Sequence, residues 1–206
     1  MYTVVKEIVI TMKWYKYDIK DLTENEYNKW YSLMSEEKQL RVDKFRFEDD
    51  KKRTVAGEML ARKAISDWCS VLPQSIVFEN DEHSKPYAKG LSVHFNISHS
   101  KDMVVCAVDD KLVGIDIEKI RHIDLAVARR ICTEEELCYI FGHTKDNQDF
   151  TLLADNEVFK RFFEIWTAKE ASVKCSGVGV SGIKTAVDKF HIKSFYFDDY
   201  IVSIYE

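Results

Sequence analysis

Two acidic residues in "VGIDIE", residues 113–118, have a spacing that suits chemistry. Asp116 and Glu118 are two positions apart, so on a β-strand their side chains share a face, with about 6 to 7 Å between the Cα atoms. Two carboxylates at that separation repel each other unless a cation lies between them, and oxygen ligands without nearby His or Cys favour Mg²⁺ over zinc. The alternative is an exposed strand face with two solvated acids. The D-x-E pattern by itself favours that alternative, because it is common.

A second stretch, "FFEIWTAKEASVK" at residues 162–174, places Glu170 and Lys174 four residues apart, on one face of a predicted helix. Taken alone, the two residues form an ordinary surface ion pair worth roughly a few tenths of a kcal/mol. Taken with Asp116 and Glu118, however, Glu170 supplies a third carboxylate, and the lysines supply charge for a phosphate. This combination is typical of a metal-assisted phosphoryl-transfer site.

The alternation in "FNISHS", residues 95–100, predicts a strand with Phe95 and Ile97 facing the core and Asn96 and Ser98 facing outward. His99, at the end of this strand, becomes a phosphate partner only if other cations lie beside it. Four cations are scattered along the chain and taken singly are solvated side chains: Lys38, Arg41, Arg53 and Lys85. The glycines of "SGVGVSG", residues 176–182, follow a helix instead of preceding one, so we interpret them as a helix C-cap and loop.

The elements that must position these residues follow from hydrophobic periodicity and caps. We expect an opening strand at 2–15, two short helices within 22–45 with N-caps Thr23 and Ser35, and a long amphipathic helix at 49–72 that stops at Pro73. Its predicted buried face comprises Val55, Met59, Leu60, Ala64 and Trp68. Short strands follow at 75–79, 92–98, 103–108 and 112–118, then helices at 124–132, 133–141 and 156–176, and a strand-like end at 190–206. Each half thus combines a long helix with antiparallel strands, which predicts an α+β fold.

The composition restricts the class of protein. Apolar residues make up 46% and charged residues 32% of 206 residues, as in globular proteins. The net charge of −5 argues against a nucleic-acid partner, so any bound anion needs a local cluster of cations. No signal peptide and no apolar run of membrane-spanning length is present, so we expect no membrane partner and a cytoplasmic location. Five cysteines without a C-x-x-C pair fit a reducing compartment: Cys69, Cys106, Cys132, Cys138 and Cys175.

Taken together, "GIDIE" and the later "WTAKEASVK" resemble the two signature motifs of the 4′-phosphopantetheinyl transferases. "KPY" and "FNISHS" upstream, and a length of 206 residues, resemble the surfactin-synthetase-activating (Sfp) type instead of the shorter holo-acyl-carrier-protein synthases. The resemblance runs in order from Lys38 to Gly179. It implies Mg²⁺-dependent transfer of 4′-phosphopantetheine from coenzyme A to a serine of an apo acyl or peptidyl carrier protein, with release of adenosine 3′,5′-bisphosphate.

The resemblance also implies a monomeric pseudo-dimer of two similar α+β halves, with coenzyme A in the cleft between them. We place the boundary at the "DDK" turn, residues 109–111. Residues 1–111 would contact the 3′-phosphate and adenine of coenzyme A. Residues 112–206 would hold the metal, the catalytic residues and the carrier-docking surface, which we expect at residues 177–190 with Lys184 and Lys189.

By motif, Asp116, Glu118 and Glu170 resemble the Mg²⁺ ligands of the family, and Glu170 the general base for the incoming serine. Lys174 resembles the lysine that steadies charge on the phosphate, and Lys169 a neighbouring phosphate contact. The N-terminal motifs carry over further contacts. Ser98 and His99 resemble residues that touch coenzyme A, and Lys85 and Pro86 resemble the segment that lines the adenine. Arg53 resembles the arginine on the 3′-phosphate, and Lys38 and Arg41 lie where the family has two further cations. Arg41 stands where the family has a lysine.

Two rival functions fit parts of the same pattern. A metal-dependent nuclease would also use acids followed by E-x-x-x-K, but it requires a basic surface that a net charge of −5 does not supply. A catalytically silent carrier-binding or coenzyme A-binding module would keep the fold without turnover. The presence of all three acids and of Lys174 argues against such a loss of catalytic activity.

Overall fold

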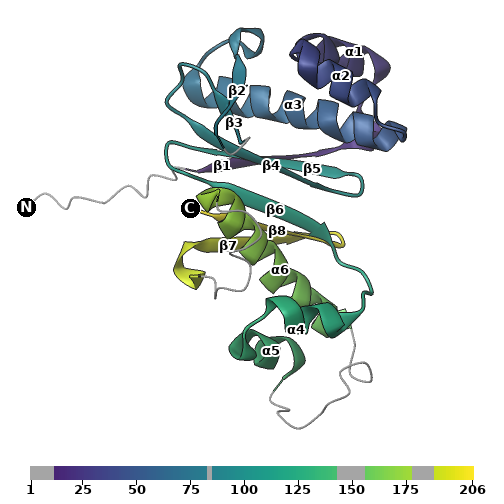
Figure 1. The fold of residues 1–206 in the computed structure, drawn as a ribbon, viewed down its shortest axis with the longest axis vertical. Helices are drawn as coiled ribbons and strands as arrows, with labels where there is room; N and C mark the ends of the chain where they lie inside the picture. Colours follow the sequence, from purple (N-terminus) through teal and green to yellow (C-terminus); the bar gives the residue numbers. More distant parts are fainter. Residues whose placement is uncertain (1–11, 83–84, 143–155, 178–187) are drawn as a thin grey trace, which may run out of the picture.

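The computed structural model describes residues 12–82, 85–142, 156–177 and 188–206, in which two antiparallel sheets lie between two long helices (Figure 1). The elements are β1 (Lys13–Asp18), η1 (Ile19–Asp21), α1 (Glu24–Ser32), α2 (Glu36–Asp43), α3 (Glu48–Cys69), η2 (Pro73–Ser75), β2 (Phe78–Asn80), β3 (Pro86–Ala88), β4 (His94–Ser100), β5 (Met103–Asp109), β6 (Gly114–Lys119), η3 (Leu125–Val127), α4 (Ala128–Ile131), α5 (Glu134–Phe141), α6 (Asn156–Ser176), η6 (Lys189–His191), β7 (Ile192–Phe197) and β8 (Tyr200–Tyr205). The mixture of helices with antiparallel strands confirms the predicted α+β class. Within the described ranges, no helix is long and apolar enough to cross a membrane.

The N-terminal half packs α3 against a sheet of order β1-β5-β4. The predicted N-caps of α1 and α2 are confirmed, since the side chains of Thr23 and Ser35 accept backbone N–H bonds there. Helix α3 ends earlier than predicted, at Cys69, because Ser70 adopts a left-handed conformation (φ 55°) before Pro73 is reached. Residues 2–11 of the predicted opening strand lie outside the described residues.

The C-terminal half packs α6 against a sheet of order β6-β8-β7. The aromatic side chains of α6 form its core with β8 and α5, and the buried members include Phe159, Phe162 and Phe163. Helix α6 ends at Ser176, and Gly177 follows with φ 74°, the backbone conformation of a helix C-cap. The remaining residues of the predicted loop, 178–182, lie outside the described part of the chain.

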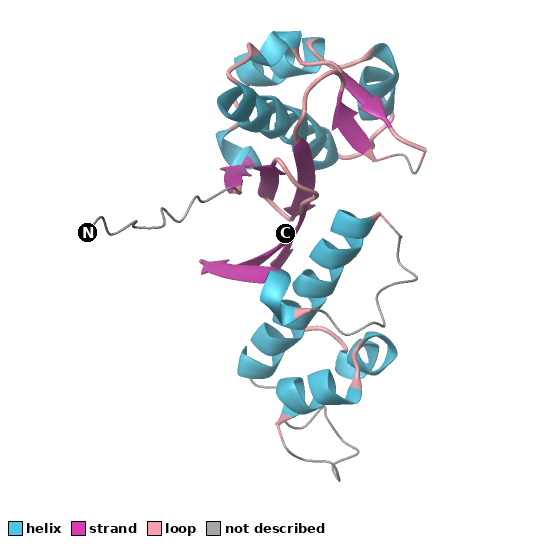
Figure 2. Cartoon of the chain, turned by 90° about the vertical axis from the view of Figure 1, so that its left-hand side faces the viewer, coloured by secondary structure: helices cyan, strands magenta, loops and turns pink. Residues whose placement is uncertain are grey.

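The two sheets stack face to face, so that the layers run α3, first sheet, second sheet, α6 (Figures 1 and 2). Strand β5 is buried throughout because its two faces serve two cores. Val104 and Cys106 face the cluster under α3, whereas Val105 and Ala107 face a cluster shared with β6 and β8. The run "MVVCAV" is therefore apolar without alternation, as expected of a strand covered on both sides.

Strands β4 and β6 meet where the two halves join, and side chains of β4 take the place of a backbone ladder there. The N–H of Ile115 donates to Asn96 Oδ1 at 2.9 Å, that of Ile117 to Ser98 Oγ at 3.4 Å, and that of Lys119 to Ser100 Oγ at 3.1 Å. The prediction that Asn96 and Ser98 face outward was therefore wrong. They lie on the face opposite to Phe95, as the alternation required, but the second sheet covers that face.

Candidate active site where the halves join

Strand β6 approaches α6 at Gly114 more closely than any other residue type would allow. A β-carbon built on Gly114 would lie 1.9 Å from the carbonyl oxygen of Ala171 and 2.6 Å from the backbone nitrogen of Cys175. The atoms that come so close to Gly114 are all helix backbone. The contact brings the acids of β6 beside the polar face of α6.

Asp116 is 5% exposed and its two carboxylate oxygens differ sharply in their surroundings. Oδ1 accepts hydrogen bonds from Ser98 Oγ at 2.8 Å and from Lys174 Nζ at 2.6 Å, whereas Oδ2 is buried and has no hydrogen-bond partner among the described residues. Burial raises the pKa of Asp116, although the positive charge of Lys174 opposes the rise. A buried carboxylate oxygen without a donor is an incomplete arrangement that a cation completes.

Glu118 lies on the same face of β6, and its Oε2 accepts from Ser100 Oγ at 2.9 Å and from Arg121 Nη1 at 2.8 Å. The guanidinium of Arg121 also lies 5.0 Å from the ring centre of Phe163 on α6, a cation–π contact that helps to hold the arginine in place. Sequence reasoning missed both Ser100 and Arg121. Ser100 had a detectable signal, because it continues the polar face of "FNISHS"; Arg121 had none.

Glu170 is half-buried on α6, and its carboxylate accepts no hydrogen bond from the other described side chains. Burial raises its pKa, the negative charges of Asp116 and Glu118 add to the rise, and Lys174 opposes it. Because the charges of Asp116 and Glu118 act on Glu170, the structure brings the three predicted carboxylates into one electrostatic cluster.

These residues fit a divalent cation by their chemistry. The donors are carboxylate oxygens, and one buried oxygen has no hydrogen-bond partner among the described residues. Burial raises the pKa of Asp116 and of Glu170, and the negative charge of neighbouring carboxylates adds to the rise. Within the described ranges, no three His, Cys, Asp or Glu side chains already converge as a set of metal ligands. Two of the carboxylates are instead bonded to the cations Lys174 and Arg121.

Lys169 does not join this cluster. It is 1% exposed and forms an ion pair of 3.0 Å with Glu136 of α5. Consecutive helical residues differ by about 100° around the axis, so Lys169 faces away from the side that carries Glu170. We therefore correct its assignment as a phosphate contact: in this structure it is a buried partner of Glu136.

Three of the predicted coenzyme A contacts line one pocket in the N-terminal half. This pocket, of about 800 Å³, lies between α2 and the β2–β3 hairpin and includes Lys38, Arg41 and Pro86. One cation, Lys44, and two aromatic rings, Phe45 and Phe78, also line it, although the sequence did not single them out. Lys38 reaches back to the buried carboxylate of Glu58 at 2.6 Å, which fixes its position at the wall.

The other predicted contacts do not line that pocket. Lys85 donates to the carbonyl oxygens of Lys174 at 2.9 Å and Cys175 at 3.4 Å, so it binds the end of α6 to the N-terminal half. Arg53 bonds to Asp50 and to the carbonyl of residue 101. Partial desolvation of the ring lowers the pKa of His99, and the positive charges of Arg53 and Lys174 lower it further. His99 thus lies close to two cations, the condition set for a phosphate partner.

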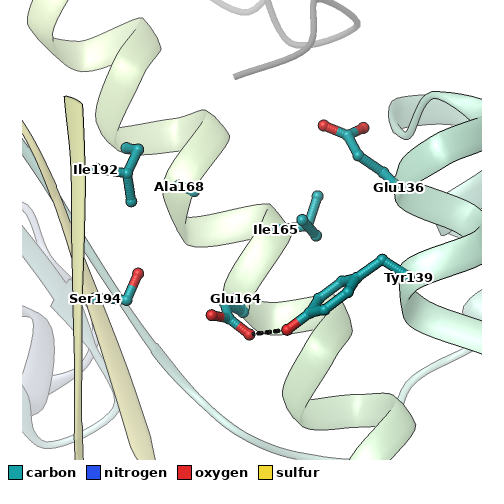
Figure 3. A pocket seen from close by; sticks show the side chains of 7 residues that line it. All are labelled: Glu136, Tyr139, Glu164, Ile165, Ala168, Ile192 and Ser194. Atoms are coloured by element: carbon teal, nitrogen blue, oxygen red, sulfur yellow. Dashed lines mark hydrogen bonds between the residues drawn. The ribbon is translucent and has the colours of Figure 1, made fainter. Parts of the chain in front are cut away.

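A second pocket, of about 390 Å³, lies between α5, α6 and β7 (Figure 3). Its lining residues include Glu164 and Ala168 of α6, with the hydroxyl of Tyr139 donating to Glu164 at 2.6 Å. Ala168 and Glu170 differ by about 200° around the helix, so this pocket opens on the flank away from the acids. None of the predicted site residues lines it among those described.

The chain is similar to known proteins over most of its length. Residues 21–111 match the N-terminal domain model of 4′-phosphopantetheinyl transferases, and residues 112–203 match the 4′-phosphopantetheinyl transferase superfamily. The transferase psf-1 of Bacillus pumilus is 39% identical over 72% of this chain and 60% of its own length, and gsp of Aneurinibacillus migulanus is 37% identical over 72% and 58%. Sfp of Bacillus subtilis is 32% identical over 84% of this chain and 72% of its own length. The chain thus spans about 60% of the first two relatives. Because of these matches, we conclude that the chain belongs to the 4′-phosphopantetheinyl transferase superfamily.

Proposed function

We propose that the protein transfers the 4′-phosphopantetheine group from coenzyme A to a serine of an apo acyl or peptidyl carrier protein, as a cytoplasmic monomer that depends on Mg²⁺. The observation that carries the proposal is the environment of Asp116. Lys174 bonds to one of its oxygens, the other oxygen is buried without a partner in the described part of the chain, and the charge of Asp116 acts on Glu170. An acid cluster next to a lysine suits displacement at phosphorus, where positioning and charge neutralisation do most of the work.

Coenzyme A carries three phosphates, and an acidic protein holds them only with a focused set of cations. Lys38 and Arg41 in the 800 Å³ pocket, with Arg53 and His99 nearer the acids, form such a set. Pro86 and the rings of the pocket suit the flat adenine. The coenzyme would then extend from this pocket, past Lys85, toward Lys174.

In the chemical step, the carrier serine oxygen attacks the phosphorus next to the pantetheine arm. Glu170 accepts the serine proton as the general base. The bond from phosphorus to the oxygen of adenosine 3′,5′-bisphosphate breaks, and Lys174 neutralises the charge on that leaving group. Asp116, Glu118 and Glu170 would hold Mg²⁺, which when bound neutralises charge on the pyrophosphate.

Carrier docking remains a proposal for residues 177–190. Lys184 lies outside the described residues. Phe190 is 98% exposed at the start of the last hairpin, and such a fully exposed ring suits contact with a partner. An acidic carrier would meet the lysines of this region.

The test is to mix the protein with coenzyme A, Mg²⁺ and apo carriers and to weigh the carriers by mass spectrometry. Wild type should add one phosphopantetheine only when both additions are present. Glu170→Gln should slow transfer by about 10²- to 10⁴-fold, because it cannot accept the proton, while coenzyme A binding persists. Glu164→Gln, on the same helix but bonded to Tyr139, is the matched control and should retain the wild-type rate.

Two results would contradict the proposal. No mass gain on carriers from fatty-acid, polyketide or peptide pathways, with coenzyme A still bound, would indicate a silent binding module. A Glu170→Gln variant that transfers at the wild-type rate would return Glu170 to an ordinary surface role.

A further inference from the structure

Two serines of β4 make the same pair of hydrogen bonds to β6. The hydroxyl of Ser98 accepts from the N–H of Ile117 and donates to Asp116 Oδ1 at 2.8 Å. Two residues along, the hydroxyl of Ser100 accepts from the N–H of Lys119 and donates to Glu118 Oε2 at 2.9 Å. Each serine thus bonds at once to the backbone of β6 and to one of its two acids.

The repetition follows from geometry. Both strands place every second side chain on one face, so an S-x-S pattern on β4 stays in register with the D-x-E pattern on β6. In each case the serine and the carboxylate that it contacts are 18 residues apart in the chain. Asn96 continues the row, but its Oδ1 only accepts from the N–H of Ile115.

The hydrogen-bonding capacity of Ser98 is fully used. A hydroxyl has one proton to donate and two lone pairs. Ser98 gives its proton to Asp116 and accepts from both Ile117 and Lys174. In this arrangement it has no donor left for a phosphate of coenzyme A, so its place beside the acids serves their orientation.

We propose that Ser100 is a positioning residue that orients Glu118 for metal binding, as Ser98 orients Asp116. The inference rests on the proposed function, in which these two acids hold the metal. Ser100 is 8% exposed, and its hydroxyl fixes one carboxylate oxygen of Glu118. The outer hydrogen bonds of a ligand set its direction, and their loss typically lowers metal affinity by about 10- to 100-fold.

The test compares Ser100→Ala with Asn96→Ala. Both variants remove an acceptor for a backbone N–H of β6, but only Ser100→Ala also removes a bond to a carboxylate. Mn²⁺ is titrated into each protein with saturating coenzyme A, and free Mn²⁺ is followed by electron paramagnetic resonance. Ser100→Ala should weaken Mn²⁺ binding by about 10- to 100-fold. Asn96→Ala should bind Mn²⁺ as wild type does, although both variants unfold at lower urea. Ser100→Thr keeps the hydroxyl and should recover the affinity.

Equal Mn²⁺ affinity in Ser100→Ala and Asn96→Ala would overturn the inference and leave Ser100 with a purely structural role, while the proposed function would stand. A wild-type protein that binds no Mn²⁺ with coenzyme A present would overturn the proposed metal site itself, and the inference with it. If Ser100→Ala does not fold, Ser100→Cys, with its weaker donor, takes its place. A Cys variant with wild-type Mn²⁺ affinity would count against the inference.

Discussion

Alanine at position 114 tests how strictly the distance between β6 and α6 is set. The new β-carbon would lie 1.9 Å from the carbonyl oxygen of Ala171, where ordinary contact begins at 3.4 Å. Strand and helix must therefore separate by about 1.5 Å, the difference between those two values. All three atoms that lie within 3.0 Å of this β-carbon belong to helix backbone, which cannot rotate away as a side chain would.

Two losses should follow from this separation. Overpacking of a closely packed interior costs about 1–3 kcal/mol of the free energy of unfolding. The displacement also moves Glu170 and Lys174 away from Asp116, and breaks the 2.6 Å contact between Lys174 and that acid. A misplacement of about 1 Å in a catalytic group lowers the rate on the order of 10²-fold. Gly114→Ala should therefore show both a lower unfolding midpoint and slower carrier modification.

Gly57→Ala is the matched control, because it adds the same methyl group at a buried site that has room. The nearest atom is the side-chain Cγ2 of Ile97, at 3.4 Å. Alanine in a helix interior is favoured over glycine by about 0.5–1 kcal/mol, so this variant should be at least as stable as wild type. Urea unfolding and mass spectrometry of the carrier measure both effects. A Gly114→Ala protein with wild-type stability and rate would refute the reasoning.

Two further predictions concern buried charges. Lys169→Met should lower the free energy of unfolding by about 3–5 kcal/mol, since it leaves Glu136 buried without its cation, and Glu136→Gln added to it should recover much of that loss in urea titrations. A Lys169→Met variant with wild-type stability but weaker coenzyme A binding would contradict this and indicate that Lys169 contacts a phosphate. Asp109→Asn should stabilise the protein at pH 7. Burial and the neighbouring Asp110 raise the pKa of Asp109 in the folded state. Wild type therefore loses stability as the pH rises from the pKa of the unfolded state to that of the folded state, whereas the Asn variant does not. Unfolding curves of the two proteins should coincide below that window, and a difference that does not change with pH would contradict the assignment.

The main acids were predictable because one strong periodicity governs each of them. Asp116 and Glu118 share a face on any strand, and Glu170 and Lys174 share one on any helix. Lys169 was misassigned although the same rule places it about 100° from Glu170. Its partner, Glu136, lies on another helix, and no local pattern in the sequence joins the two.

Asn96 and Ser98 show the limit of alternation more generally. A period of two tells which side chains share a face, but it does not tell whether water or a second sheet covers that face. The stacking of the two sheets is a long-range property, and the hydrogen bonds to Ile115 and Ile117 depend on it. The alternation also places Ser100 on this face, but its bond to Glu118, 18 residues away, depends on the same stacking.

The row of β4 side chains that bonds to β6 also affects how the second half would behave without the first. An isolated second half would present β6 as an edge strand, with the N–H groups of Ile115, Ile117 and Lys119 unpaired and the apolar face of its sheet uncovered. Unprotected edges of this kind recruit strands from other molecules and lead to aggregation. In the whole chain, β4 blocks that edge with polar side chains and not with a backbone ladder, so the two sheets do not fuse into one. The β4 side chains that bond to Asp116 and Glu118 therefore also keep β6 from pairing with a neighbouring molecule.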